Sequence, residues 1–422
     1  MRYRQWKFTT AWRVPLLYAL FALTAGTVLP RIERAYLPGL SSAVSVSAAM
    51  AMYSSIASGM IALTGIVFSL TFVMVQFSAT AYSPRVVLWL ARDPLISHAL
   101  GIFMATFLYA VAALAWVDRG GASVPFVSAI MVIVLLLASV GFFVALIHRV
   151  ALLQVHRLLG FMASQGREVI DDVYPPLDAE TAILPRDEPL PAPSQICSHQ
   201  GRPLIVQTVR AGELVQLAAR YGVLLEVVAA VGDTVVESMP LVYVRGSSER
   251  IDEELLTDPI ELGEERTFDQ DPKYAIRLLA DIAIKALSPA VNDPTTAVQA
   301  LDQIGDLLLR LSWRRLEIGA FRDDRGVLRL LIPFPSWDDF LWLAFDEIRC
   351  YGATSIQVMR RMNALISDLL RAVPVERRDA LRQWHERLAS SIGRHFDDPD
   401  ERKEARREDR QGIGSPRQRP AA

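Results

Sequence analysis

The chain contains a run of 50 residues, from Ala35 to Pro84, without a single charged side chain. About 20 consecutive apolar residues are enough for a helix to cross a bilayer. The run is therefore long enough for one long helix or for two membrane spans. Hydrophobic residues make up 52% of the whole chain, more than an ordinary soluble protein carries. The sequence thus predicts an integral membrane protein.

Three other segments are apolar enough to cross a bilayer. The first has 17 uncharged residues between Arg13 and Arg31 and follows a basic leader. It is either a membrane span or a signal peptide. Because Ala25-Gly26-Thr27 matches a cleavage site only loosely, we favour an uncleaved span. The other two segments cover about 96–117 and 124–147.

The distribution of Lys and Arg decides between one and two spans in the uncharged run, because these residues collect on the cytoplasmic side. With one span, nine of them lie inside (Arg2, Arg4, Lys7, Arg13, Arg85, Arg92, Arg149, Arg157 and Arg167) and three outside (Arg31, Arg34 and Arg119). With two spans, the split becomes five inside and seven outside. We therefore expect four spans in residues 1–150, at about 14–30, 56–78, 96–117 and 124–147, with both termini cytoplasmic in a bacterial inner membrane.

The rest of the chain is polar, and its net charge is negative whereas that of residues 1–150 is positive. Residues 1–150 carry ten Lys and Arg against three Asp and Glu, whereas the remainder carries 34 against 43. The net charge of −2 gives no reason to expect a nucleic acid as partner. Two Cys are too few for a disulfide framework or a Cys-based metal site, which fits a reducing cytosol.

We expect five regions after the last span. Residues 151–173 have the apolar spacing of an amphipathic helix that continues the fourth span. A Pro-rich linker at 174–194 precedes a small α+β module at 195–246 and a helical domain at 264–395, and a charged tail at 396–422 is expected to be disordered. The predicted fold is an α-helical membrane protein, with four transmembrane helices and a cytoplasmic α+β, mostly helical, C-terminal domain.

The small module is predicted to contain three strands, at 202–209, 223–231 and 238–246, and a helix at 212–222 that Gly222 closes. Its segment GDTVVESMPL is similar to the turn of biotinyl and lipoyl modules but lacks their modifiable Lys. We interpret the segment as a structural β-turn.

In the helical domain we expect helices at 272–288, 294–311, 337–350, 353–372 and 376–393, and a strand at 326–334. Three helix starts have a capping residue followed by proline or acids, namely Asp271, Asp293 and Ser336. Together with Asp269 and Asn292, the two aspartates could also bind Mg²⁺ or Ca²⁺. We favour capping, because both aspartates stand immediately before proline.

Three segments carry a family resemblance: ALTGIVFSLTFVMVQFSATAYSPRV, GDTVVESMPLVYV and RTFDQDPKYAIRLLADIAIKALSPAVNDPTTAVQALDQI. The chain resembles, over about residues 10–395, the bacterial predicted membrane proteins of the domain of unknown function 2254 family. The resemblance implies an integral membrane protein with a soluble C-terminal region. It implies no activity and no catalytic residues.

Local signatures of enzymes are absent from the sequence. It contains no GxxxxGK[ST], GxGxxG, HExxH or GxSxG, and no two of its six His have the spacing of ligands on one helical face. We therefore expect no metal and no cofactor, and an enzyme is less favoured than other classes of protein.

A stripe of small residues runs along the helix that contains the second span. Its members recur at steps of three or four residues and so share one helical face: Ser47, Ala51, Ser54, Ser58, Ala62, Gly65 and Ser69. Small residues allow helices to approach closely in lipid, so helix packing is the first interpretation. The second is a polar pore lining in an oligomer.

A charged stripe, made of Arg277, Asp281 and Lys285, lies on an otherwise apolar helix. Ion pairs on a solvated face are the first interpretation. An aqueous vestibule or a subunit contact is the second.

The function that we expect from these features is a channel-like or solute-permeation assembly, formed by a homo-oligomer in the lipid bilayer with an unknown ligand. The alternatives are a membrane-anchored cytosolic scaffold or sensor and, third, a membrane-bound hydrolase. The absence of ionisable residues in the middle of the spans argues against proton-coupled transport.

Overall fold

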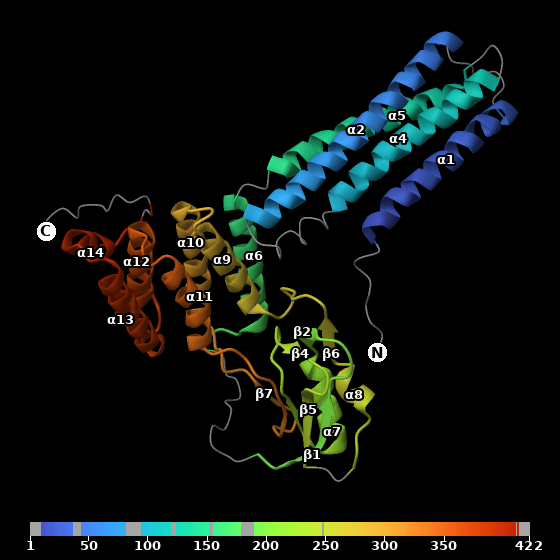
Figure 1. Ribbon diagram of the computed structural model, residues 1–422. Coiled ribbons are helices and arrows are strands. Elements are labelled where there is room, and N and C mark those ends of the chain that lie inside the picture. Colours follow the sequence, from blue (N-terminus) through green and yellow to red (C-terminus); the bar gives the residue numbers. More distant parts are fainter. Residues whose placement is uncertain are drawn as a thin grey trace. The chain divides into compact units, whose positions relative to one another are not determined.

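The computed structural model describes residues 10–36, 44–81, 94–119, 124–151, 155–178, 190–246, 249–410 and 412. The chain divides into an N-terminal unit that ends at Gln154 and a C-terminal unit that begins at Val155 (Figure 1). Each unit has its own packed interior.

The N-terminal unit contains four long helices: α1 (Thr10–Tyr36), α2 (Val46–Ala81), α4 (Pro94–Arg119) and α5 (Phe126–Ala151). Each contains a stretch long and apolar enough to cross a membrane: Arg13–Glu33, Val46–Val73, Pro94–Val117 and Phe126–His148. The prediction of four spans is thereby confirmed. The larger part of the uncharged run forms the single helix α2, as the distribution of Lys and Arg indicates.

Helix α4 is the central helix of this bundle and lies against α1, α2 and α5. Its contact with α1 is close because glycines face larger residues. A Cβ atom on Gly26 would lie 2.7 Å from the Cβ of Ala112, and one on Gly101 would lie 2.9 Å from the ring of Tyr18. Two glycines therefore allow α1 and α4 to approach each other. The Thr106 and Ser139 hydroxyls, 2.8 Å apart, join α4 to α5.

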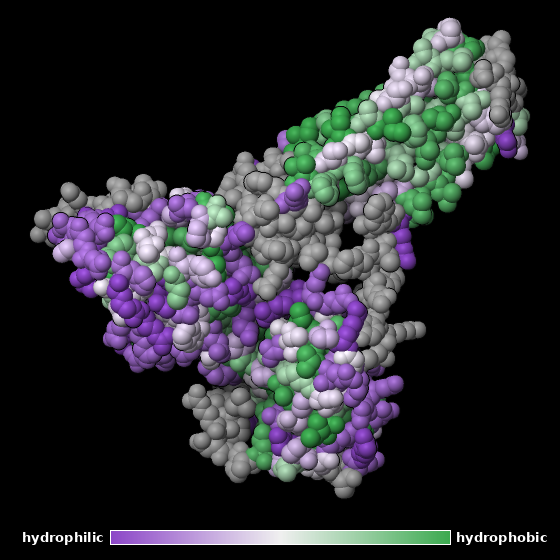
Figure 2. All heavy atoms as spheres, viewed as in Figure 1, coloured by the Kyte–Doolittle hydropathy of each residue, from purple (hydrophilic) through white to green (hydrophobic). Residues whose placement is uncertain are grey.

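The two units present different surfaces. The visible face of the four-helix unit is mostly hydrophobic, whereas hydrophilic residues cover much of the C-terminal unit (Figure 2). Large exposed apolar side chains line α1 and α5, among them Leu20, Phe21 and Leu137. Such a surface suits contact with lipid acyl chains.

The C-terminal unit contains a layer of helices: α6 (Val155–Val173), α9 (Pro272–Ala286), α10 (Pro294–Ser312), α11 (Trp337–Tyr351), α12 (Ile356–Ala372) and α13 (Arg378–His395). Helix α10 lies at its centre, against α6, α9, α11 and α12. A short 3-10 helix, Val375–Arg377, precedes α13. Residues 152–154, where we expected the fourth span to continue into the amphipathic helix, lie outside the described residues.

Two sheets complete this unit. The larger one has the strand order β1-β5-β3-β8-β7 and the smaller one β4-β2-β6. The strands are β1 (Pro193–Ser198), β2 (Leu204–Val209), β3 (Leu224–Val227), β4 (Thr234–Val235), β5 (Pro240–Arg245), β6 (Ile260–Gly263), β7 (Ala320–Arg322) and β8 (Leu328–Leu331). Helices α7 (Ala211–Tyr221) and α8 (Glu253–Thr257) pack beside them, and Gly222 ends α7 at a φ of 66° as expected.

The five-stranded sheet extends across the expected boundary between the small module and the helical domain. Strand β8 pairs in parallel with β3, with Leu225 opposite Leu330 and Glu226 opposite Leu331. Strands β7 and β8 belong to the segment that we expected to be a separate helical domain. Strand β1 also begins inside the expected Pro-rich linker. The small module is therefore completed by residues about 100 positions later in the chain.

The expected disorder from residue 396 onward is wrong for the segment that follows α13. Helix α14 (Pro399–Ala405) begins at the capping residue Asp398, and the segment docks on α12. The side chain of Arg360, 10% exposed, pairs with Glu404, and the amide of Asn363 donates to the Arg406 carbonyl. Opposite charges therefore hold a segment whose lack of apolar periodicity suggested disorder. Residues 413–422 lie outside the described residues.

Candidate functional site

The small-residue stripe of α2 lies on the outer face of its own bundle. All seven residues, from Ser47 to Ser69, are exposed. A Cβ atom added to Gly65 would meet nothing within 4 Å. The face of α2 that packs inside the chain is a different one, formed by Ala49, Tyr53, Ala57, Met60 and Val67. Packing within one chain thus does not account for the stripe.

The exposed face of α2 also differs in composition from the exposed faces of its neighbours. Between Ser47 and Gly59, every exposed residue of α2 is Ser, Ala or Gly. The hydroxyl groups of Ser54, Ser58 and Ser69 make no hydrogen bond within the described residues. The exposed side chains of α1 and α5, by contrast, are mainly large and apolar. From Ser47 to Gly59 the exposed face of α2 is therefore smooth and partly polar, whereas from Ile61 onward it also carries large apolar side chains such as Ile66 and Phe68.

The charged stripe of α9 joins two helices. Arg277 donates to Asp281 one turn further on, at 2.6 Å from its Nε, and to Glu347 on α11 at 2.7 Å. The hydrogen bond from Arg277 lowers the pKa of Glu347, and the bonds to Glu347 and Asp281 raise that of Arg277. Lys285 is exposed. The expected pair Arg277–Asp281 is present, and Glu347 is a partner that spacing within one helix could not reveal.

The three expected capping residues accept backbone hydrogen bonds at helix starts. Asp271 accepts from the Tyr274 amide, Asp293 from that of Thr296, and Ser336 forms a capping box with Asp339. These bonds give each side chain a structural role. In the described part of the chain, no three His, Cys, Asp or Glu side chains group as metal ligands do.

Asp271 has a second contact that the capping pattern did not indicate. The side chain is only 2% exposed, and the Arg266 Nε donates to its Oδ2 at 2.9 Å. Burial raises the pKa of Asp271, and the neighbouring Arg266 guanidinium opposes that rise. Gly232, at a φ of 90°, borders this pair, since a Cβ atom there would lie 2.5 Å from Asp271 Oδ2. The glycine of GDTVVESMPL thus makes room for a buried ion pair.

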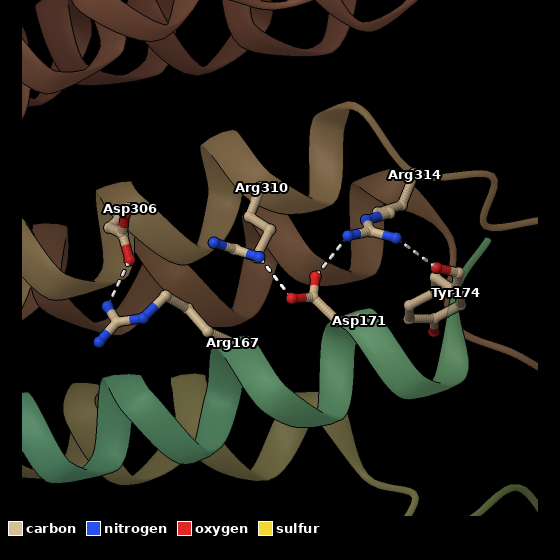
Figure 3. A network of polar contacts seen from close by, with 6 residues as sticks. All are labelled: Arg167, Asp171, Tyr174, Asp306, Arg310 and Arg314. Atoms are coloured by element: carbon tan, nitrogen blue, oxygen red, sulfur yellow. Dashed lines mark hydrogen bonds and ion pairs between the residues drawn. The ribbon is translucent and has the colours of Figure 1, made fainter. Parts of the chain in front are cut away.

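A ladder of ion pairs joins α6 to α10 (Figure 3). Arg167 Nη1 lies 2.7 Å from Asp306 Oδ2, while the carboxylate of Asp171 pairs with both Arg310 and Arg314. Arg314 also donates to the Tyr174 carbonyl at 3.1 Å. The first members of these pairs lie about 140 residues before their partners, so no local pattern could have revealed them. The ladder fixes the helix that follows the last membrane span onto the soluble helices.

These features define an integral membrane protein with four candidate spans and a mixed, mostly helical C-terminal unit. The predicted membrane protein family DUF2254 matches residues 9–368, and the chain belongs to this family. An uncharacterized protein of Mycobacterium tuberculosis H37Rv, Rv1290c, is 28% identical over 399 residues, which cover 91% of this chain and 74% of that protein. The uncharacterized protein Mb1321c of Mycobacterium bovis has the same identity and coverage. No solved structure matches the chain.

Proposed function

We propose that this protein forms a homo-oligomeric, channel-like assembly in the bacterial inner membrane, with the small-residue face of α2 at the contact between subunits. The observation that carries the proposal is the contrast between the part of this face from Ser47 to Gly59, where every exposed residue is Ser, Ala or Gly, and the bulky exposed faces of α1 and α5. The hydroxyls of Ser54, Ser58 and Ser69 are exposed and have no hydrogen-bond partner among the described residues, and Gly65 has open space beside it.

The physical chemistry of lipid supports an assembled state. Small residues gain packing when another helix approaches closely, and Ser hydroxyls gain hydrogen bonds there that acyl chains cannot supply. Where several copies of the same face surround an axis, hydroxyl groups line a path that water and small solutes can follow. The α2 face thus serves both as a helix contact and as the border of a solute path.

The orientation of the assembly is part of the proposal. The four-span arrangement places nine Lys and Arg on one side of the membrane and three on the other. This asymmetry favours a cytoplasmic position for both termini and for the C-terminal unit. Cysteine labelling of intact cells tests this. A residue introduced into the 31–50 segment should react with an impermeant thiol reagent, and one introduced into residues 160–400 should not. External labelling within residues 160–400 would contradict the orientation.

A membrane-anchored scaffold or sensor is the second candidate. The ladder between α6 and α10 favours it, because a helix that begins four residues after α5 is fixed firmly to the soluble helices. In that case the spans anchor and assemble the protein, and the α2 face is a helix contact alone.

Substitution of glycine tests the helix contact. Gly65→Leu places a bulky side chain where a second copy should approach. We expect the assembly to weaken in detergent while the protein still inserts, because leucine is favourable in lipid. Gly141→Leu on α5 is the matched control, since Gly141 is also exposed and has nothing within 4 Å of a Cβ position. Light scattering measures the oligomer. If Gly65→Leu and Gly141→Leu behave alike, the contact is not at Gly65.

Cysteine substitution tests the solute path. In a Cys350→Ser background, which removes the exposed native thiol, Ser58→Cys and Ser69→Cys should react with a small impermeant reagent, and the reaction should alter ion flux in liposomes. Leu137→Cys on the exposed face of α5 should stay unreactive, because we expect it to face lipid. If the Ser69→Cys thiol is unreactive and the reconstituted protein conducts nothing, the scaffold or sensor replaces the channel.

A further inference from the structure

A buried polar cluster lies at one end of the four-helix bundle. It consists of Glu33 on α1, Tyr53 on α2, Tyr109 on α4 and Ser128 on α5, and we name it the Glu33 cluster. The four residues are between 0% and 4% exposed. Every membrane helix of the unit contributes one of them. The aliphatic neighbours around the tyrosines include Ala49, Ala113 and Val117.

Glu33 caps the start of α5. Its Oε1 accepts from the Val127 amide at 2.9 Å and its Oε2 from the Ser128 amide at 3.3 Å. These two amides belong to the first turn of α5, where backbone N–H groups have no partner within the helix. The carboxylate also balances the positive end of the helix dipole. The acceptor sites left on each carboxylate oxygen remain available.

Three hydroxyl groups of the cluster are unsatisfied. Those of Tyr53, Tyr109 and Ser128 are buried and have no hydrogen-bond partner within the described residues. The Tyr109 and Ser128 side chains are near enough to each other for a weak hydrogen bond, so the Tyr53 hydroxyl is the clearest unsatisfied group among the described residues. Buried polar groups without partners are rare in proteins, and unseen water or an ion is a usual explanation.

Hydrogen-bond counting distinguishes water from a cation. Each hydroxyl has one proton to donate, and a carboxylate only accepts. A water molecule accepts from a hydroxyl and donates to the carboxylate, so that it satisfies both. A cation would take up the carboxylate acceptor sites that the hydroxyl protons could otherwise reach through water, and the positive end of α5 opposes its binding.

We infer that ordered water binds inside this end of the bundle and joins the Glu33 carboxylate to the hydroxyl groups of Tyr53, Tyr109 and Ser128. The inference is independent of the α2 face and of oligomer formation, because Tyr53 lies on the packed side of α2. The water completes the contact between α1, which supplies the carboxylate, and α5, whose first turn it caps.

The sign of a change in stability tests this inference on the full chain in detergent. If water bridges the groups, Tyr53→Phe, Tyr109→Phe and Ser128→Ala each remove a hydrogen bond, and the Tm should fall by roughly 2 °C or more. If the cluster is dry, Tyr53→Phe removes an unsatisfied hydroxyl and the Tm should rise, which would overturn the inference, whereas Tyr109→Phe and Ser128→Ala would also remove the contact between their two hydroxyls. Tyr36→Phe is the matched control, because Tyr36 is 80% exposed, and its Tm should not change.

A double-mutant cycle with Glu33→Gln adds a second readout. Glutamine keeps an acceptor for the α5 amides but lacks the charge. Tyr109→Phe should lower the Tm less in that background than in the wild type, since the two groups share water. Full additivity would contradict a shared network. A Tm that rises in sodium or potassium chloride, relative to choline chloride of the same ionic strength, would place a cation there instead. If Glu33→Gln does not fold, the sign of the Tm change for Tyr53→Phe still decides.

Discussion

Arg167 on α6 and Asp306 on α10 form an ion pair at 2.7 Å across 139 residues of chain. The pair belongs to a contact that also buries Leu159, Met162, Val169 and Ile170 of α6. Helix α6 is therefore an integral part of the C-terminal unit, and it packs against α9 and α10.

A fragment that comprises residues 155–412 should be soluble and folded, whereas one that begins at residue 193 should be far less stable. The shorter fragment lacks α6 and exposes the apolar faces of α9 and α10. Losing even two fully buried aliphatic side chains costs about 3–6 kcal/mol. Circular dichroism and urea unfolding measure the difference. Equal stability of the two fragments would show that α6 does not contribute to the soluble core.

Replacement of Gly232 by alanine should destabilise the protein by about 2 kcal/mol or more. The new Cβ atom would need a positive φ and would collide with the Arg266–Asp271 pair. Gly212→Ala is the matched control, because Gly212 lies in α7 with open space around it. That substitution should stabilise the protein by about 0.5–1 kcal/mol. Thermal unfolding measures both, and equal effects of the two substitutions would refute the role given to Gly232.

Truncation separates the docked part of the C-terminal segment from the rest. A chain that ends at residue 412 should unfold at the same temperature as the full chain. A chain that ends at residue 397 should unfold at a lower temperature, because Arg360 and Asn363 lose their partners and Arg360 is left as a largely buried charge. Equal Tm values for the two truncated chains would show that residues 398–412 do not stabilise the fold, as the expected disorder implies.

The pair between Arg277 and Glu347 should give a small dependence of stability on pH. Since the pKa of Glu347 is lowered in the folded state, its stabilisation is fully present above the ordinary value near 4.5 and is lost as the pH falls through the lowered value. The side chain of Glu347 is 49% exposed, so solvent limits the gain to at most about 1 kcal/mol. Glu347→Gln should remove this dependence. Parallel pH profiles of the two proteins would contradict the assignment.

Sequence patterns predicted the features that depend on neighbouring residues alone, namely the membrane spans and the helix starts. The uncharged run and the unequal distribution of Lys and Arg predicted four spans, and proline after Asp271 and Asp293 predicted two helix starts. Contacts between distant segments were not predictable in this way. The partners of Arg167, Arg266 and Arg277, the pairing of β8 with β3 and the docking of α14 all depend on how segments meet in space.

In the candidate sites, too, local features were predictable from the sequence and contacts between distant segments were not. The periodicity of the small residues in α2 correctly placed them on one face, but it could not show that this face points away from the other helices of its own bundle. The Glu33 cluster was missed because its four residues come from four helices and have no common spacing. Their one local signal was a single acidic residue at the end of an apolar span.

The parallel pairing of β3 with β8 affects how the chain can fold as the ribosome makes it. One edge of β3 has no strand beside it until β8, some 100 residues later, has been synthesised. By that stage the membrane spans have already left the exit tunnel, and β1, β3 and β5 have been exposed with an open sheet edge. Open edges of this kind attract other strands. We therefore expect the nascent protein to depend most on chaperones between the synthesis of β5 and that of β8, and ribosome profiling of chaperone-bound nascent chains would locate that interval.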